Sequence, residues 1–206
     1  MTRARFFPTH LTVVLASALI SGAAGSAVAA PGPSFDCKRA EPGSIEATIC
    51  GDERLAQLDR RLADVYARAA AKATNEHPPT LRAEQRGWIK GRNECGKSSD
   101  RVRCIADAYR LRTAELQARY RLVSFTGPVF YACGGSPANE VVATFFPTDP
   151  PVAIVERGDS VSVMFAQPTG SGTKYVGRNE SLWEHQGEAL VTWGPGAPEM
   201  RCVVRR

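Results

Sequence analysis

Residues 166–189 read AQPTGSGTKYVGRNESLWEHQGEA and combine a small polar loop with two short segments of alternating apolar and polar residues. The segments at residues 173–176 and 180–183 have the pattern of short β-strands. The loop before them contains Gly-Ser-Gly at residues 170–172, and its glycines permit the positive φ values that a tight, outward-bulging loop needs. The serine hydroxyl between the glycines both donates and accepts hydrogen bonds. This stretch therefore predicts two strands that hang from an exposed polar loop.

The same alternation runs through the second half of the chain, from residue 129 onward. Such segments are VFYAC, EVVATFF, VAIVER, SVSVMFA, TKYV, ESLW, EALVTW and RCVVR. Glycine-rich turn sequences separate them, for example GGSP at residues 134–137 and GPG at residues 194–196. Short strands with frequent turns predict an antiparallel sandwich or barrel.

The first half of the chain has the period of helices instead. Helices are predicted at residues 44–50, 52–72, 80–95 and 100–120. In the second of these, apolar residues recur at three- and four-residue steps, which indicates one buried stripe. Gly51 is expected to end the first helix and Asp52 to cap the second, while Pro78-Pro79 break the chain before the third. This half is therefore predicted to be a small helical bundle.

The N-terminus has the features of a secretory signal peptide. Arg3 and Arg5 precede an apolar segment at residues 11–20, and Ala27-Val28-Ala29 provides a cleavage site, so residues 1–29 are expected to be removed. No cysteine lies near this site to accept a lipid, and no later segment approaches the roughly 18 apolar residues of a membrane span. We therefore expect a periplasmic or secreted protein without a membrane anchor.

The chain contains 6 cysteines, and an even number in an exported protein favours disulfides. The preferred pairs in the helical half are Cys37–Cys50 and Cys95–Cys104, because each closes a loop at a helix end; three connectivities of these cysteines stay open. Cys133 and Cys202 lie in the first and last predicted strands, so their bridge would join the ends of the sheet. No CxxC motif occurs and His77 and His185 are isolated, so neither a metal nor another cofactor is expected.

The formal net charge of +5 is unevenly distributed. Its positive excess lies before residue 126, whereas residues 126–206 contain slightly more acidic than basic residues. A mildly acidic second half suits a basic partner, because opposite charges speed encounter. Export argues against a nucleic-acid partner.

The barrel-like half resembles the periplasmic and membrane-bound C-type lysozyme inhibitors (MliC/PliC-like). The similarity rests on Y-x-C at residues 131–133, the run SGxKY, Trp183, Glu188-Ala189 and the terminal cysteine. In that family a serine loop and a nearby basic side chain enter the lysozyme cleft. The lysozyme-binding residues that the resemblance implies here are Ser171, Gly170, Gly172, Lys174, Tyr175 and His185.

Two positions depart from the pattern of that family. His185 stands where the family has a lysine, and Gln186 stands where it has a glycine. A lysozyme cleft holds one protonated and one ionised carboxyl group, and a cation beside Ser171 would pair with the ionised one. Histidine still donates a hydrogen bond when neutral, but it is charged only near or below about pH 6.5 unless its site raises the pKa. Lys174 is another possible cation, and alternation places it on the opposite face from Tyr175.

The helical half resembles the LprI-type N-terminal domain, named after a lysozyme-inhibiting lipoprotein. The resemblance covers residues 37–121. The matching residues include Leu55, Leu58, Asp59, Leu62, Tyr66, Gln85, Trp88, Arg92, Cys95, Cys104, Tyr109 and Arg112. From the residues alone, Trp88 with Arg92 is interpreted as bundle packing with a snorkelling guanidinium.

Together these observations predict an α+β multidomain protein. It comprises a signal peptide (1–29), a disulfide-stapled helical bundle (30–124) and an eight-stranded antiparallel β-barrel (126–206). Tyr175, Trp183 and Trp193 are expected in the core of the barrel rather than on a recognition surface.

The expected function is non-enzymatic inhibition of C-type lysozyme, by plugging the active-site cleft with the Ser171 loop and His185. Ser171 lacks the G-x-S-x-G context of a nucleophile, and no third group orients His185 as a base. The alternative is a non-inhibitory periplasmic module that binds envelope glycan or a partner protein, which the missing lysine favours. The lysozyme that is targeted, the role of the helical domain and the oligomeric state stay open.

Overall fold

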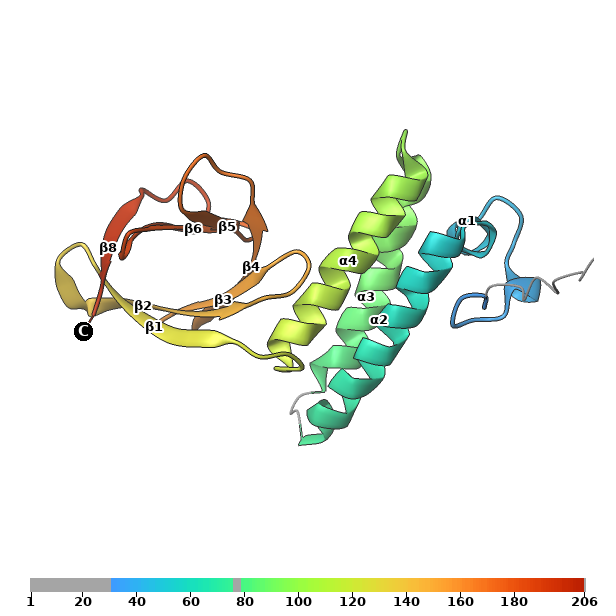
Figure 1. Cartoon of the computed structure of the whole chain (residues 1–206), viewed down its shortest axis with the longest axis horizontal. Coiled ribbons are helices and arrows are strands. Elements are labelled where there is room, and N and C mark those ends of the chain that lie inside the picture. Colours follow the sequence, from blue (N-terminus) through green and yellow to red (C-terminus); the bar gives the residue numbers. More distant parts are fainter. Residues whose placement is uncertain (1–30, 76–78, 206) are drawn as a thin grey trace, which may run out of the picture. The chain divides into compact units, whose positions relative to one another are not determined.

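A computed structural model of the 206-residue chain describes residues 31–75 and 79–205. The predicted signal peptide therefore lies outside the described residues. Within them, helices come first and strands follow, at the point where the sequence period changes (Figure 1). We call residues 31–122 the helical part and residues 126–204 the barrel.

The helical part consists of α-helices joined by short 3-10 turns. The elements are α1 (Ile45–Gly51), α2 (Glu53–Lys72), α3 (Thr80–Asn93) and α4 (Arg101–Arg119), with η1 (Cys37–Arg39), η2 (Ala73–Asn75) and η3 (Glu94–Lys97). These bounds agree with the sequence prediction to within a few residues. Among the described residues, no helix combines the length and apolar character that crossing a membrane requires.

Side-chain caps fix where three of these helices begin. The Ser44 hydroxyl accepts a hydrogen bond from the backbone N–H of Ala47 at 3.0 Å, and Asp100 accepts one from Arg103 at 3.0 Å. Asp52 accepts from the N–H groups of both Arg54 (2.9 Å) and Leu55 (3.2 Å). Gly51 is the last helical residue of α1 rather than the first residue after it, and Asp52 serves both as C-cap of α1 and as N-cap of α2. A single residue, Asp52, therefore connects the two helices.

The core of the helical part forms where α2 and α3 each pack against α4. Its fully buried members include Ile49, Leu55, Ile105, Tyr109 and Leu116. Burying one such aliphatic or aromatic side chain contributes about 1.5–3 kcal/mol, so the apolar stripes read from the sequence account for this packing.

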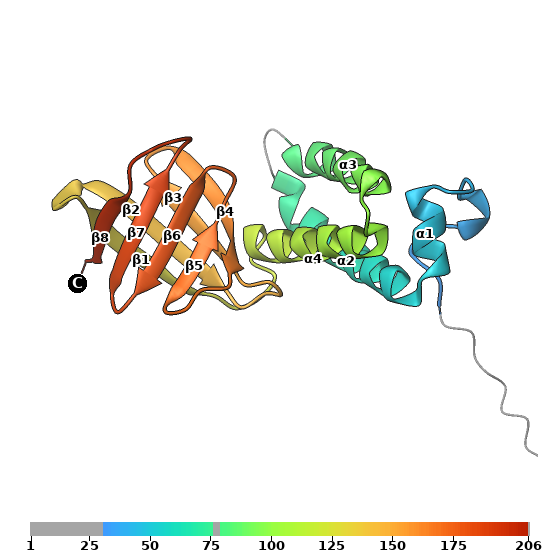
Figure 2. The ribbon, with the colours of Figure 1, turned by 90° about the horizontal axis from the view of Figure 1, so that it is seen from above.

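The barrel is closed. Its strands are β1 (Thr126–Cys133), β2 (Ser136–Phe146), β3 (Val152–Arg157), β4 (Ser160–Gln167), β5 (Thr173–Val176), β6 (Glu180–His185), β7 (Glu188–Trp193) and β8 (Met200–Val204). Each strand pairs antiparallel with the next, and β8 returns to pair with β1 (Figure 2). The predicted eight-stranded antiparallel barrel is therefore confirmed, and the sandwich that strand alternation alone also allowed is excluded. Alternate side chains fill its interior, as small barrels require.

Three disulfides are present, and they are the pairs expected from the sequence. Cys37–Cys50 joins η1 to α1, Cys95–Cys104 joins η3 to α4, and Cys133–Cys202 joins β1 to β8. The last pair lies directly opposite in the register of the two strands that close the barrel. No free cysteine occurs in the part of the chain that the structure describes.

Candidate functional site

A row of side chains crosses the outer face of strands β5 to β8, which lie side by side in Figure 2. The register pairs Lys174 with Trp183, Trp183 with Leu190, and Leu190 with Arg201. Directly paired residues of neighbouring strands point to the same face of a sheet. Lys174, Trp183, Leu190 and Arg201 therefore form one continuous row, which we call the outer row.

The Ser171 loop is fastened to the outer row through its backbone. The indole Nε1–H of Trp183 donates to the carbonyl oxygen of Ser171 at 3.0 Å, and the Thr169 hydroxyl donates to the same oxygen at 3.1 Å. The hydroxyl of Ser171 is exposed and makes no hydrogen bond within the described residues. The loop thus offers a free hydroxyl on a fixed backbone.

Gly172 brings this loop against strand β6. Its φ is +65°, and a Cβ at this position would lie 2.3 Å from the carbonyl oxygen of Glu184 and 3.1 Å from the His185 side chain. Only glycine allows so close an approach in this conformation. Gly170 differs, since its φ is not positive and a Cβ there would meet nothing within 4 Å. Both glycines permit positive φ values, as expected from the sequence, but only Gly172 adopts one.

His185 is exposed at the end of β6, beside the loop. Gln186 and Gly187 follow it in a tight turn with φ values of 52° and 83°, which pairs His185 with Glu188 on β7. β6 therefore extends two residues beyond the predicted end at residue 183. This extension places the imidazole on the face that carries Trp183.

Glu188 and Arg201 form an ion pair next to His185. One guanidinium nitrogen of Arg201 lies 2.7 Å from both carboxylate oxygens of Glu188. The hydrogen bond to Glu188 and the charge of its carboxylate raise the pKa of Arg201, so the guanidinium stays protonated. Both side chains are largely exposed, so this pair shapes the surface more than it stabilises the fold.

These groups line a cleft of about 410 Å³ on the barrel surface. Its lining residues are Ser171, Trp183, His185, Glu188, Ala189, Leu190 and Arg201. We call it the barrel cleft. It combines a free hydroxyl and an imidazole with an apolar wall of indole and leucine.

Four predicted binding residues lie outside the lining of the barrel cleft: the two loop glycines, Gly170 and Gly172, and two side chains of β5, Lys174 and Tyr175. The Lys174 ammonium lies 5.9 Å from the centre of the Trp183 ring, on the outer face. Tyr175 points the other way and is only 8% exposed in the barrel core. Burial, aided by the charge of Glu184, raises the pKa of its hydroxyl. The opposite orientation of these two side chains is the one that strand alternation predicts.

The position of Trp183 differs from the one predicted from the sequence. This residue was expected in the core with Tyr175 and Trp193, and Trp193 does pack against the barrel core. Trp183, however, pairs across the strands with Lys174 rather than Tyr175, and so lies outside the barrel. Sequence reasoning also missed Glu188 and Arg201 as a pair. The available signal was Cys202: a buried cysteine in a strand places its neighbour Arg201 outside.

The barrel cleft shows no assembled catalytic or metal centre. Within the described residues, Ser171 and His185 form no hydrogen bond with each other, so a nucleophile–base pair is not formed. No group of three or more His, Cys, Asp or Glu side chains in the described ranges is arranged to hold a metal ion.

Comparisons with known proteins cover both parts of the chain. Residues 37–116 match the family model described as lysozyme inhibitor LprI, and residues 131–200 match the model described as membrane-bound lysozyme-inhibitor of c-type lysozyme. Similar proteins include Lipoprotein LprI of Mycobacterium tuberculosis and Lipoprotein LprI of Mycobacterium bovis. Each is 28% identical over 181 residues, covering 87% of this chain and 89% of the relative.

No solved structure matches the chain significantly. Both matched families are lysozyme inhibitors, which supports this general role and a lysozyme partner. The two-part resemblance predicted from the sequence is confirmed: an LprI-type helical part is followed by an MliC-type barrel.

Proposed function

We propose that this protein inhibits c-type lysozyme by inserting the Ser171 loop and the neighbouring His185 into the active-site cleft of the enzyme. The observation that carries the proposal is the free Ser171 hydroxyl on a backbone that Trp183 holds in place. The contact of Gly172 with His185 puts a second donor beside it. A plug that is ordered before binding loses little conformational entropy on insertion.

The proposed chemistry matches the two carboxyl groups of a lysozyme cleft. The Ser171 hydroxyl donates to one of them, and the protonated imidazole of His185 pairs with the ionised one. Lys174 offers a second cation at the edge of the interface. Gly170 leaves the loop narrow, and Tyr175 acts from the core by holding β5. The slightly acidic charge of residues 126–206 supports a basic partner.

We propose that the protein acts outside the cytoplasm, in the periplasm or after secretion. Its three disulfides suit an oxidising compartment, and this supports the signal peptide predicted at residues 1–29. The proposed division places a helical module at residues 30–124 and an inhibitory module at residues 126–206.

The test is a turbidity assay in which hen-egg-type lysozyme lyses bacterial cell walls in the presence of the mature chain. We expect inhibition that saturates at equimolar protein. Ser171→Trp should abolish it by blocking entry, whereas Ser160→Trp, at an equally exposed serine at the start of β4, should inhibit like the native protein. Full lysis at molar excess would contradict inhibition, and equal inhibition by both variants would exclude the Ser171 loop as the plug.

A second candidate function is a non-inhibitory module that binds a partner protein or envelope glycan. The observation that favours it is His185 at the position of the family lysine, because a neutral imidazole offers no permanent charge to a lysozyme carboxylate. The same assay separates the two candidates.

A further inference from the structure

A second cleft lies in the helical part, with a volume of about 560 Å³. Two helices supply matching stripes to its walls. The stripes are Asp59, Leu62, Ala63 and Tyr66 on α2, and Gln85, Trp88, Ile89 and Arg92 on α3. In both, the positions are i, i+3, i+4 and i+7, which share one helix face. We call this the helical cleft.

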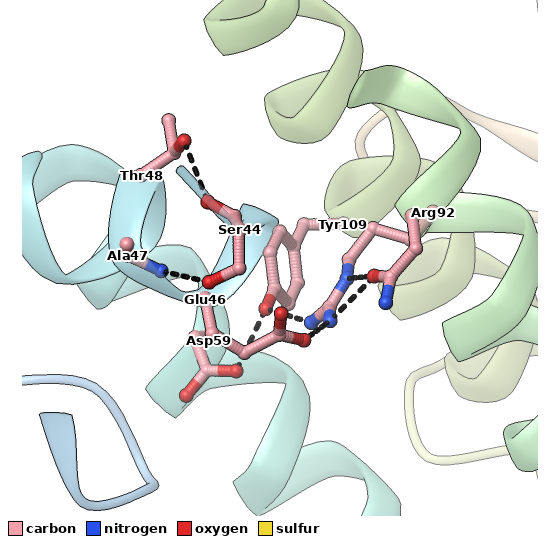
Figure 3. Close-up of polar contacts among 8 residues, drawn as sticks. Ser44, Glu46, Ala47, Thr48, Asp59, Arg92 and Tyr109 are labelled. Atoms are coloured by element: carbon pink, nitrogen blue, oxygen red, sulfur yellow. Dashed lines mark hydrogen bonds and ion pairs between the residues drawn. The ribbon is translucent and has the colours of Figure 1, made fainter. Parts of the chain in front are cut away.

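A buried polar network forms the floor of the helical cleft (Figure 3). The hydroxyl of Tyr109 on α4 donates to Asp59 at 2.8 Å and accepts from Arg92 at 2.8 Å. The Arg92 guanidinium also forms an ion pair with Glu46, and Asp59 accepts the backbone N–H of Ser34 at 2.6 Å. Arg92 is 6% exposed and Asp59 7% exposed. Buried charges of this kind persist because each has a partner of opposite charge or a strong hydrogen bond.

The network leaves Arg92 little capacity for a ligand. Its guanidinium donates to Tyr109 and Glu46, and both Nε and Nη2 donate to the side chain of Asn93. The carboxylates are less fully used, since each oxygen of Asp59 accepts one hydrogen bond and a carboxylate offers about four acceptor sites. The floor therefore offers acceptors more than donors.

The rim of the cleft supplies donors. Arg39 is exposed and Tyr66 half-buried, and neither side chain makes a hydrogen bond or ion pair within residues 31–75 and 79–205. Each therefore has polar atoms free for a ligand. Donors and acceptors are both available, at different places on the cleft surface.

Aromatic side chains form the apolar surface of the cleft. Phe35, Tyr66 and Trp88 are partly buried against the core of the helical part, and Ile89 beside them is 38% exposed. Trp88 is held in place, because its indole N–H donates to the Ala108 carbonyl at 3.3 Å and its ring meets Tyr109 edge-on at 5.3 Å. The apolar wall is thus formed before any ligand arrives.

This combination discriminates among classes of ligand. An anion would meet one free guanidinium, that of Arg39, because Arg92 is engaged in the floor, and the carboxylates that line the same cleft would repel it. A cation would meet the carboxylates of Asp36, Glu46 and Asp59, but the guanidinium groups of Arg39 and Arg92 line the same cleft and oppose it. A neutral ligand whose hydroxyl groups both donate and accept, and whose ring faces are apolar, satisfies the free polar groups and the aromatic wall together.

We propose that the helical cleft binds a short neutral oligosaccharide, stacked on Trp88 and Tyr66 and hydrogen-bonded to Asp59 and Arg39. Its volume lies within the roughly 300–1,000 Å³ of small-molecule sites. This site is separate from the lysozyme-binding loop of the barrel, and it gives the helical part a role of its own.

The test is calorimetric titration of the mature chain, without lysozyme, with chitotriose and with cellotriose. We expect saturable binding of at least one of these trisaccharides. Tyr66→Leu keeps the apolar bulk but removes the aromatic face and hydroxyl, and should weaken binding about tenfold or more, which corresponds to roughly 1.4 kcal/mol. Arg39→Ala should weaken it severalfold, and its exposed position spares the fold. Arg61→Ala, at an equally exposed arginine of α2 outside the cleft, should leave it unchanged.

Absence of binding for both sugars at millimolar concentrations would overturn the proposal. Equal affinities for the native protein and both cleft variants would overturn it as well, since the sugar would then bind elsewhere. Saturable binding of a lysine-rich peptide in place of either sugar would show that the acidic groups select a cation. Lysozyme inhibition by Tyr66→Leu should equal that of the native protein, so failure here is distinguishable from failure of the barrel site.

Discussion

At the scale of single residues, Gly172 decides where the Ser171 loop lies. Gly172→Ala would place a Cβ 2.3 Å from the Glu184 carbonyl oxygen at a φ of +65°, so the loop must move. We expect a loss of stability of about 1–3 kcal/mol and a larger loss of inhibition. Gly170→Ala is the matched control, because its Cβ meets nothing within 4 Å. Chemical denaturation and the inhibition assay measure the two effects, and equal behaviour of both variants would contradict the role of Gly172.

His185 makes the proposed inhibition depend on pH. An imidazolium that pairs with an ionised carboxylate keeps its proton in the complex, so the complex holds more protons than the separate partners. Binding through an imidazolium should therefore weaken as pH rises, because histidine side chains lose their charge at neutral pH and above. His185→Lys should flatten this fall, and His185→Gln should bind weakly throughout.

The measurement is the dissociation constant against pH for these three proteins, with one lysozyme at fixed salt. The glutamine variant keeps the lysozyme carboxyl groups and the charged neighbours Glu188 and Arg201, so the difference between its curve and that of the native protein belongs to His185. Parallel curves for the native protein and the glutamine variant would show that His185 brings no charge to the interface.

The residues of the site were only partly predictable from the sequence. Ser171 was expected on an exposed loop because glycines flank it, and the structure agrees. Arg201 was not expected in the same cleft, because it is far along the chain and meets Leu190 only through the β7–β8 register. Trp183 was misplaced for a related reason. Alternation predicts that Lys174 and Tyr175 point to opposite faces of the sheet, but only the β5–β6 register shows that Trp183 shares its face with Lys174.

At the scale of elements, Asp52 joins α1 to α2. Burial opposes its ionisation, but the hydrogen bonds from Arg54 and Leu55 outweigh burial and lower the pKa of its carboxyl group below 3.8. A lowered pKa contributes stability above the ordinary carboxyl pKa and loses it as pH falls through the lowered value. The contribution of Asp52 should thus be complete at neutral pH and disappear below about pH 4.

Asp52→Ala should therefore cost about 1 kcal/mol in the free energy of unfolding at pH 7 and less near pH 3. Asp52→Asn keeps a capping oxygen without the charge, and should lose less than Asp52→Ala at neutral pH. Urea denaturation at both pH values measures these differences. A pH-independent gap between the native protein and Asp52→Ala would show that the charge of the cap contributes nothing.

Helices were easier to predict than the closure of the sheet, for a physical reason. A cap such as Ser44 and an apolar stripe are local, so a few neighbouring residues contain the information. Closure depends on the pairing of β1 with β8, and Cys133 and Cys202 are separated by 69 residues. A sandwich and a barrel share the same alternation, so only this long-range pairing distinguishes them. The extension of β6 to His185 was hard to predict as well, because it requires Gln186, which is not a glycine, to adopt a positive φ in the turn that follows.

At the scale of the whole molecule, the disulfides differ in what they constrain. Cys133–Cys202 closes a loop with a sequence separation of 69 residues, whereas Cys37–Cys50 closes one of 13. In the chain-entropy model these contribute roughly 4 and 3 kcal/mol. Replacing both cysteines of the longer pair with alanine should therefore lower the thermal midpoint more than replacing those of the shorter pair. Calorimetry of both double variants checks this order, and the reverse order would contradict the entropic account.

The pairing of β8 with β1 also limits how any partner can approach the barrel. In a sheet that closes on itself every strand has a neighbour on both sides, so no strand of the barrel presents a whole free edge to solvent. A partner cannot add a strand of its own, which is a common way for proteins to recognise one another. A partner must therefore bind through the loops and the outward-facing side chains. The same closure leaves other copies of the chain no strand edge with which to pair.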